Sequence, residues 1–239
     1  MNLSSPAAWT HVVFVGISWL LAISPPLHAQ NWSIQVGTNL TQYQFTNSEG
    51  NTLDALRPSS GRHLEIGYQK VLLDTSKLLL KTNKSAVYFS NHQTQAKLMS
   101  MLRLGVQLSS DQYNAAGNVG INQFAYQTEY VGIGLHAGFQ LPISKKTSVE
   151  VLGKLNGQSL IQGTQRLDTQ LLDLRTDSQF NGLQVLAGYV VQLNYRINSM
   201  AGLHLGFQSM KSMGVSEVHG TLLAFQPATV FVGIRLFPN

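Results

Sequence analysis

Charged side chains are scarce in this chain of 239 residues, because Asp, Glu, Lys and Arg together supply only 11% of it. A typical soluble domain has about 25%. Cysteine is absent, which excludes disulfide bonds and a lipoprotein anchor. After the N-terminal segment no apolar run approaches about 18 residues, the length that a membrane-spanning helix needs. The composition therefore argues against both a soluble protein with an ordinary charged surface and a bundle of membrane helices.

The sequence does contain strict alternation, which is clearest in residues 130–141. Apolar residues at every second position, with small or polar residues between them, are typical of a strand with two unlike faces. A helix is disfavoured because each of the three glycines in this stretch would destabilise it by about 1 kcal/mol. The apolar positions are Val131, Ile133, Leu135, Ala137, Phe139 and Leu141, and Gly132, Gly134, His136, Gly138 and Gln140 lie between them.

Seven further segments repeat this pattern, so the chain has eight candidate strands after residue 30. Their connections alternate between short and long, which is typical of outer-membrane barrels with short periplasmic turns and long external loops. The seven segments are 32–45, 62–72, 97–109, 147–155, 183–197, 202–208 and 230–236. The short connections are 142–146 and 198–199, and the long ones are 46–61, 110–124, 156–180 and 210–219.

The pattern predicts an all-β fold, an eight-stranded antiparallel up-and-down transmembrane β-barrel. Residues 74–96 are the exception: they are either a long periplasmic turn or an additional hairpin, which would make ten strands. A chain that starts and ends on the same side of the membrane needs an even number of strands, which both alternatives satisfy.

Alternation by itself leaves open which face points outward, since a soluble lipocalin-like barrel would turn its apolar face inward around a ligand. The other face carries Gly, Gln, Asn and His with isolated charges, which suits a packed lumen better than a water-facing surface. Aromatic residues also gather near the strand ends, as two interfacial girdles would require. We expect Trp32, Phe139, Tyr195 and Phe237 in the periplasmic girdle, and Tyr43, Phe45, Tyr126, Tyr130 and Phe225 in the external one.

Residues 1–29 are predicted to be a secretory signal peptide, and residues 30–239 the barrel domain. An apolar stretch from Trp9 to Ile23 is followed by Pro25 and Pro26, and cleavage is expected after Ala29. The alternative is an uncleaved anchor. Secretion across the inner membrane and residence in the outer membrane follow from the first interpretation.

The net charge of +5 does not indicate nucleic-acid binding, because the basic residues are scattered and no basic helix or aromatic-basic interleaving accompanies them. Basic side chains near the rims of a barrel would instead meet anionic lipid head groups or lipopolysaccharide, at about 1 kcal/mol for each charge. We therefore expect outer-membrane lipid and lipopolysaccharide as partners.

The alternating strands, the N-terminal signal and the final segment Phe231-Val232-Gly233-Ile234-Arg235-Leu236-Phe237 resemble those of small outer-membrane β-barrel proteins of the "porin family". Their architecture is similar to that of the barrel of outer membrane protein A. The resemblance covers residues 30–239. It implies that the last strand carries an aromatic-ended signal for the barrel assembly machinery, with Phe237 in that place, although Pro238 and Asn239 follow it.

Several charged and histidine residues lie on the polar face of the strands. They are candidates either for an ion path or for a paired network that fills a barrel too narrow for an open pore; buried charges need partners, so we favour the structural network. The set is Glu65, Arg103, His136, Glu150, Lys154, Arg196, His204 and Arg235.

The expected function is a structural or loop-presenting role with little or no pore activity, without enzymatic activity, cofactor or metal. The alternatives are a small porin, an accessory to a secretion apparatus docking through the lysines between Lys70 and Lys97, or an enzyme that modifies lipids. Ser90-Asn91-His92 is the nearest catalytic candidate, because some barrels of this class, such as lipid A deacylase, use Ser, His and a carboxylate. The loop 156–180 is the expected contact for an unknown partner.

Overall fold

The computed structural model describes residues 30–46, 56–71, 100–119, 122–168, 170–177, 180–213, 216–218 and 221–237. The predicted signal peptide (1–29), the ambiguous segment 74–96 and the cluster Ser90-Asn91-His92 lie outside the described residues. So does nearly all of the stretch between Lys70 and Lys97.

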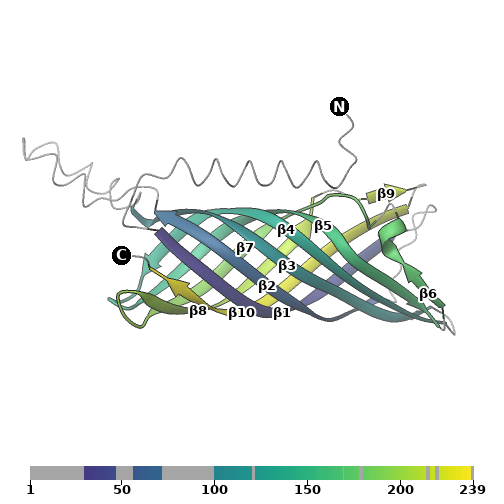
Figure 1. Cartoon of the computed structure of the whole chain (residues 1–239), viewed down its shortest axis with the longest axis horizontal. Coiled ribbons are helices and arrows are strands. Elements are labelled where there is room, and N and C mark those ends of the chain that lie inside the picture. Colours follow the sequence, from purple (N-terminus) through teal and green to yellow (C-terminus); the bar gives the residue numbers. More distant parts are fainter. Residues whose placement is uncertain are drawn as a thin grey trace, which may run out of the picture.

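Eight long strands form one closed antiparallel barrel, in which each strand pairs with the next and the last pairs with the first (Figure 1). This confirms the predicted eight-stranded up-and-down fold. The barrel strands are β1 (Gln30–Thr46), β2 (Leu56–Val71), β3 (Leu102–Val119), β4 (Asn122–Pro142), β5 (Thr147–Leu167), β7 (Gln184–Arg196), β8 (Ala201–Ser212) and β10 (Thr221–Leu236).

The two ends of the barrel differ. At one end, called here the turn end, residues 143–146 join β4 to β5 and residues 197–200 join β7 to β8. The opposite end, the loop end, carries the short strands β6 (Gln170–Asp173) and β9 (Ser216–Val218) and a 3-10 turn, η1 (Leu174–Thr176). Figure 1 shows β6 and β9 at the opposite end from the C-terminus.

Large apolar side chains cover the outside of the barrel. Val36, Leu135 and Ile234 are each more than half exposed, although they lie in the middle of paired strands. A continuous apolar belt of this kind would be an aggregation surface in water, but it is the surface that a barrel presents to lipid. The prediction that the apolar face points outward is therefore confirmed, and the lipocalin-like alternative is wrong. Among the described residues, no helix has the length and hydropathy to cross a membrane.

Several strands extend well beyond their predicted bounds. The predicted loop 110–124 is almost entirely strand, because β3 continues to Val119 and β4 starts at Asn122. β5 likewise continues to Leu167 through the first half of the predicted loop 156–180, and β2 starts at Leu56 inside the predicted loop 46–61. The prediction of long irregular loops was therefore wrong for these segments.

The reason is that the polarity of the two faces reverses along the strands. In β3 the outward residues change from Leu104 and Leu108 to Gln112, while the inward ones change from Gln107 to the buried Tyr113. Beyond the lipid belt the outside of a strand meets water, so the apolar residues belong inside. Polar outward residues in an Asn- and Gly-rich segment have the composition of a loop, although the backbone remains a strand.

Two register shifts mark the level of this reversal. One lies between Ser59 and His63 in the pairing of β2 with β3, and the other at Glu129 and Tyr130 in the pairing of β4 with β5. His63 pairs with Asp111, and Asp111 with Tyr130, so both shifts occur at the same height of the barrel. Bulges increase local twist and re-aim side chains, which fits a boundary between two differently packed sections.

The predicted external girdle of aromatic residues is wrong. Tyr43, Tyr130 and Phe225 are at most 3% exposed and face the interior, and Tyr126 is half-buried against them. The strand carrying Phe45 is described, but its side chain is not. At the turn end Trp32, Phe139 and Tyr195 are 42–48% exposed on the outside, as a girdle requires. Phe237 instead lies beside the turn-end opening, under the guanidinium of Arg196.

Close approach of neighbouring backbones explains one of the glycines in β4. A Cβ atom at Gly138 would lie 2.1 Å from the carbonyl oxygen of Val151, whereas one at the outward-facing Gly153 would meet its nearest atom at 3.7 Å. We expect Gly138→Ala to lower the free energy of unfolding by about 1–3 kcal/mol through overpacking. Gly153→Ala is the matched control and should change it by about 0.5 kcal/mol or less. Urea unfolding in detergent, followed by heat-dependent gel migration, measures both; equal effects would contradict the close approach.

Candidate functional site

The interior of the membrane section is a layer of paired charges. Lys154 from β5 donates from its Nζ to Glu65 Oε2 of β2 at 2.5 Å and to Gln208 Oε1 of β8 at 2.7 Å. Glu65 and Lys154 are each 6% exposed. The pair crosses the barrel between non-adjacent strands, so it fills the lumen.

A second pair lies nearer the turn end. Arg235 from β10 donates two hydrogen bonds to Glu150 from β5. Its Nη1 donates to Oε1 at 2.6 Å, and its Nη2 donates to Oε2 at 3.0 Å. Gln192 also donates to Glu150 Oε2. Glu150 is fully buried and Arg235 is 5% exposed. Bidentate geometry and burial make this the strongest ionic contact in the described part of the barrel.

Three histidines also bond to polar side chains inside the barrel. His63 Nδ1 lies 2.6 Å from Asp111 Oδ1, and Gln35 links the His63 ring at 3.3 Å to the His204 ring at 3.1 Å. His136 lies 3.1 Å from Gln107. All of these contacts join side chains within the barrel.

The structure brings four of the eight sequence-derived residues together in two groups, each completed by a glutamine. Glu65, Lys154 and Gln208 form one, and Glu150, Arg235 and Gln192 the other. Glu150 and Lys154 are not partners of each other, since each pairs with a different strand. Arg103 is half-buried near the turn end and donates to Gln140. Arg196 lies apart: it is exposed at the rim because β7 ends there, and its guanidinium carbon lies 4.5 Å from the centre of the Phe237 ring.

Sequence reasoning misses the glutamines of the network and two of its titratable members, His63 and Asp111. Asp111 falls in a segment predicted to be a loop, so its position opposite His63 is not expected from the pattern. His63 shares the strand face of Glu65, and this period-two relation is the signal that could have found it.

Above the charged layers, the loop end is closed by a cluster of buried apolar side chains, called here the apolar plug. Phe225 lies at its centre, with ring-centroid distances of 4.9 Å to Tyr43, 5.9 Å to Tyr130 and 6.2 Å to Phe180. The Tyr43 hydroxyl donates to the carbonyl oxygen of Tyr113 at 3.1 Å. The plug consists of Tyr43, Tyr113, Ala115, Tyr130, Leu160, Leu174, Phe180, Leu223 and Phe225.

The sequence does not predict the plug, although a signal for it is present. Tyr43 has the same parity along β1 as the inward Gln35 and Asn39, and Phe225 has the same parity along β10 as Arg235. Assigning the faces by parity, instead of by position near a strand end, places both rings inside.

At the loop end, β6 pairs with the end of β5 and continues into η1, whose Leu174 belongs to the apolar plug. Arg175 donates from Nη2 to Asp173 Oδ2 at 2.6 Å, and its backbone N–H donates to Asp173 Oδ1 at 2.9 Å. These hydrogen bonds lower the pKa of the exposed Asp173 carboxyl. The segment predicted to contact a partner is therefore partly ordered.

No cluster of three or more His, Asp or Glu side chains suited to a metal ion occurs among the described residues. His136 and His204 each bond to a glutamine instead. The catalytic candidate Ser90-Asn91-His92 is outside the described part of the chain, so its geometry enters none of the conclusions below.

The closed barrel, its apolar belt and its filled interior define a transmembrane β-barrel protein. No protein-family model matches the chain, and a comparison with curated proteins also finds no match. Similar solved structures include Neisserial surface protein A, with 11% sequence identity and a TM-score of 0.46, covering 87% of this chain and 97% of that one.

Two further similar structures are the outer membrane protein OprG from Pseudomonas aeruginosa and the outer membrane protease OmpT from Escherichia coli. The first has 10% identity and a TM-score of 0.41, covering 88% of this chain and 98% of that one. The second has 7% identity and a TM-score of 0.41, covering 90% and 98%. Sequence identities of 11% or less and TM-scores below 0.5 are too low to assign an activity, a ligand or a partner to this chain. The eight-stranded fold rests on the strand pairing described above.

Proposed function

We propose that this chain is a non-conducting, non-enzymatic β-barrel of the outer membrane that supports the envelope and presents its loop end outside. The closed barrel and its lipid-facing belt support the location, because only a closed sheet can cross a membrane as strands. In this proposal residues 1–29 are a cleaved signal peptide, the turn end faces the periplasm, and outer-membrane lipid and lipopolysaccharide surround the barrel. Phe237 lies in the final segment that the barrel assembly machinery would read.

The main support for the proposed lack of ion conductance is that side chains fill the interior of the barrel. Hydrated ions would have to displace the Lys154–Glu65 and Arg235–Glu150 pairs and then the apolar plug, of which Tyr130 and Phe225 are at most 1% exposed. Breaking one buried pair leaves an uncompensated charge, which is strongly unfavourable. The lumen charges therefore have a structural role in this proposal.

A presenting role for the loop end has separate support. Leu171 is 71% exposed and Leu172 is 47% exposed on β6, which is paired with the far end of β5, beyond the reversal of polarity. These leucines stand apart from the lipid belt. An ordered strand that displays apolar side chains to water is a suitable contact for a partner.

We expect no stable conductance steps when the full-length protein is reconstituted into planar bilayers. Current recordings over a range of voltages measure this, and the same preparation unfolded by heat is the control for leaks that do not depend on the fold. Large, stable steps from the folded sample would overturn the proposed function and favour a porin.

A further inference from the structure

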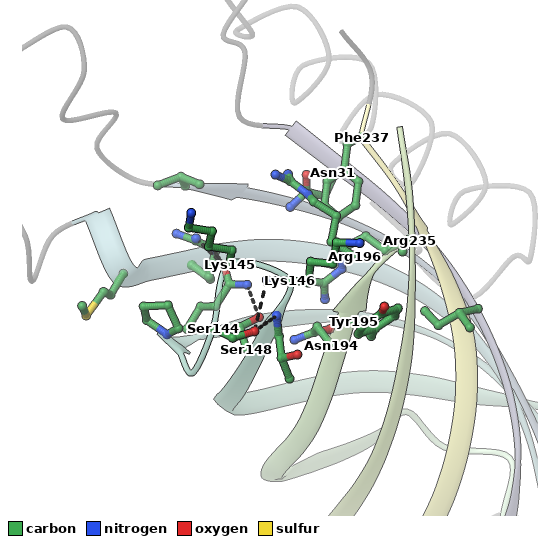
Figure 2. A pocket seen from close by; sticks show the side chains of 18 of the residues that line it. Asn31, Ser144, Lys145, Lys146, Ser148, Asn194, Tyr195, Arg196, Arg235 and Phe237 are labelled. Carbon is green, nitrogen blue, oxygen red and sulfur yellow. Dashed lines mark hydrogen bonds between the residues drawn. The ribbon is translucent and has the colours of Figure 1, made fainter. Parts of the chain in front are cut away.

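The barrel opens at its turn end into a cavity of about 890 Å³. Residues from all eight barrel strands line it, together with the turn 143–146 (Figure 2). This volume is within the range of about 300–1,000 Å³ that small-molecule sites occupy. The cavity lies on the turn-end side of the Arg235–Glu150 pair and is separate from the apolar plug at the loop end.

The lining of the cavity has an unbalanced charge. It contains five cationic residues and no acidic one among the described residues. Within the described part of the chain, Arg235 alone among these five has an ion pair, and its partner is Glu150. Arg103 donates to neutral groups, the Gln140 side chain and the carbonyl oxygen of Ser100. The five are Arg103, Lys145, Lys146, Arg196 and Arg235.

Two buried polar side chains in the same lining have atoms without a hydrogen-bond partner among the described residues. The Nε atom of Arg235 and both polar atoms of the Asn194 side chain make no hydrogen bond within the described part of the chain, although these residues are 5% and 8% exposed. A buried polar atom without a hydrogen-bond partner is unfavourable, so these atoms favour a ligand that can bond to them. Figure 2 shows Asn194 and Arg235 among the side chains around this cavity.

We propose that the turn-end cavity binds a phosphate group, carried either by a small soluble compound or by a phospholipid headgroup. Phosphate oxygens would accept from Arg235 Nε and Asn194 Nδ2 at the buried part of the cavity. The exposed Arg196, Lys145 and Lys146 surround its opening and attract the anion. A hydroxyl of the ligand, or of the protonated phosphate, would donate to Asn194 Oδ1.

Calorimetric titration of the full-length protein in neutral detergent, with inorganic pyrophosphate at low salt, tests the proposal. We expect saturable binding that weakens as salt is added, because exposed charges are screened. Lys145→Gln/Lys146→Gln should weaken binding about thirtyfold, since each of the two basic side chains contributes about 1 kcal/mol and about 1.4 kcal/mol corresponds to a factor of ten. Both lysines are exposed in a turn, so this variant should keep the fold.

The matched control is Arg57→Gln/Lys211→Gln, which removes the same two charges from exposed positions outside the cavity. It should leave the pyrophosphate affinity within twofold of that of the unaltered protein. Asn194→Ala tests the buried part of the cavity: it should weaken binding without lowering the urea midpoint. The absence of saturable binding, or equal weakening by the two double variants, would overturn the proposal.

Nanodiscs distinguish the two sources of phosphate. If a lipid headgroup occupies the cavity, pyrophosphate should bind in detergent but be excluded in nanodiscs that contain phosphatidylglycerol. If a soluble phosphate compound is the ligand, binding should be equal in both. Either result supports phosphate recognition and assigns its source.

Discussion

Glu150→Ala is expected to lower the free energy of unfolding by about 3–5 kcal/mol, the loss typical of breaking a buried ion pair. The substitution leaves the Arg235 guanidinium 5% exposed and without a carboxylate. It also leaves Gln192 without its acceptor. Urea titration of the detergent-solubilised protein measures the loss, with heat-dependent gel migration reporting the folded fraction.

Two further variants give this prediction its control. Asp173→Ala removes the carboxylate of the Arg175–Asp173 pair, which has the same chemistry but is exposed to water. It should leave the unfolding midpoint unchanged, because water replaces the lost contact. Glu150→Leu/Arg235→Met removes both charges and should recover most of the stability lost in Glu150→Ala. A Glu150→Ala protein as stable as the Asp173→Ala protein would mean that water fills the lumen and screens the pair.

Phe225→Ala is expected to lower the free energy of unfolding by about 3–5 kcal/mol, as truncation of a buried aromatic residue does. Phe225 is 1% exposed and lies against Tyr43, Tyr130 and Phe180 from three other parts of the chain. The stiff ends of paired strands cannot collapse fully into the space left by the ring. The same urea titration measures the effect.

Phe225→Leu is the matched control, because it keeps most of the volume and the apolar character. Phe225→Leu should lower the free energy of unfolding by less than about 1.5 kcal/mol. If both substitutions at Phe225 have the same small effect, the rings at the loop end do not form a packed interior. The barrel would then be open to water from that side, and the proposed absence of conductance would lose its main support.

The sequence predicts which residues of the candidate site face the lumen, but not how they pair. Period-two parity alone places Glu65, Glu150, Lys154 and Arg235 on the lumen face. The sequence does not predict their pairing, because the partners are far apart in the chain. Lys154 and Glu65 are separated by 89 positions, and Arg235 and Glu150 by 85. Contacts across a lumen depend on how the barrel closes and on the stagger between its strands.

The sequence by itself determined the strand alternation and the outward direction of the apolar face. It left the number of barrel strands at eight or ten, and the strand pairing decided for eight. Local side-chain chemistry settles the alternation and its direction, because a strand between lipid and a narrow lumen must alternate. Only the tertiary structure decided where the lipid belt ends. The strands continue past that level with their polarity reversed, so that Tyr43 and Phe225 turn inward as a plug instead of outward as a girdle. Alternation looks the same in both sections, and only the closed barrel shows which side of each strand meets water.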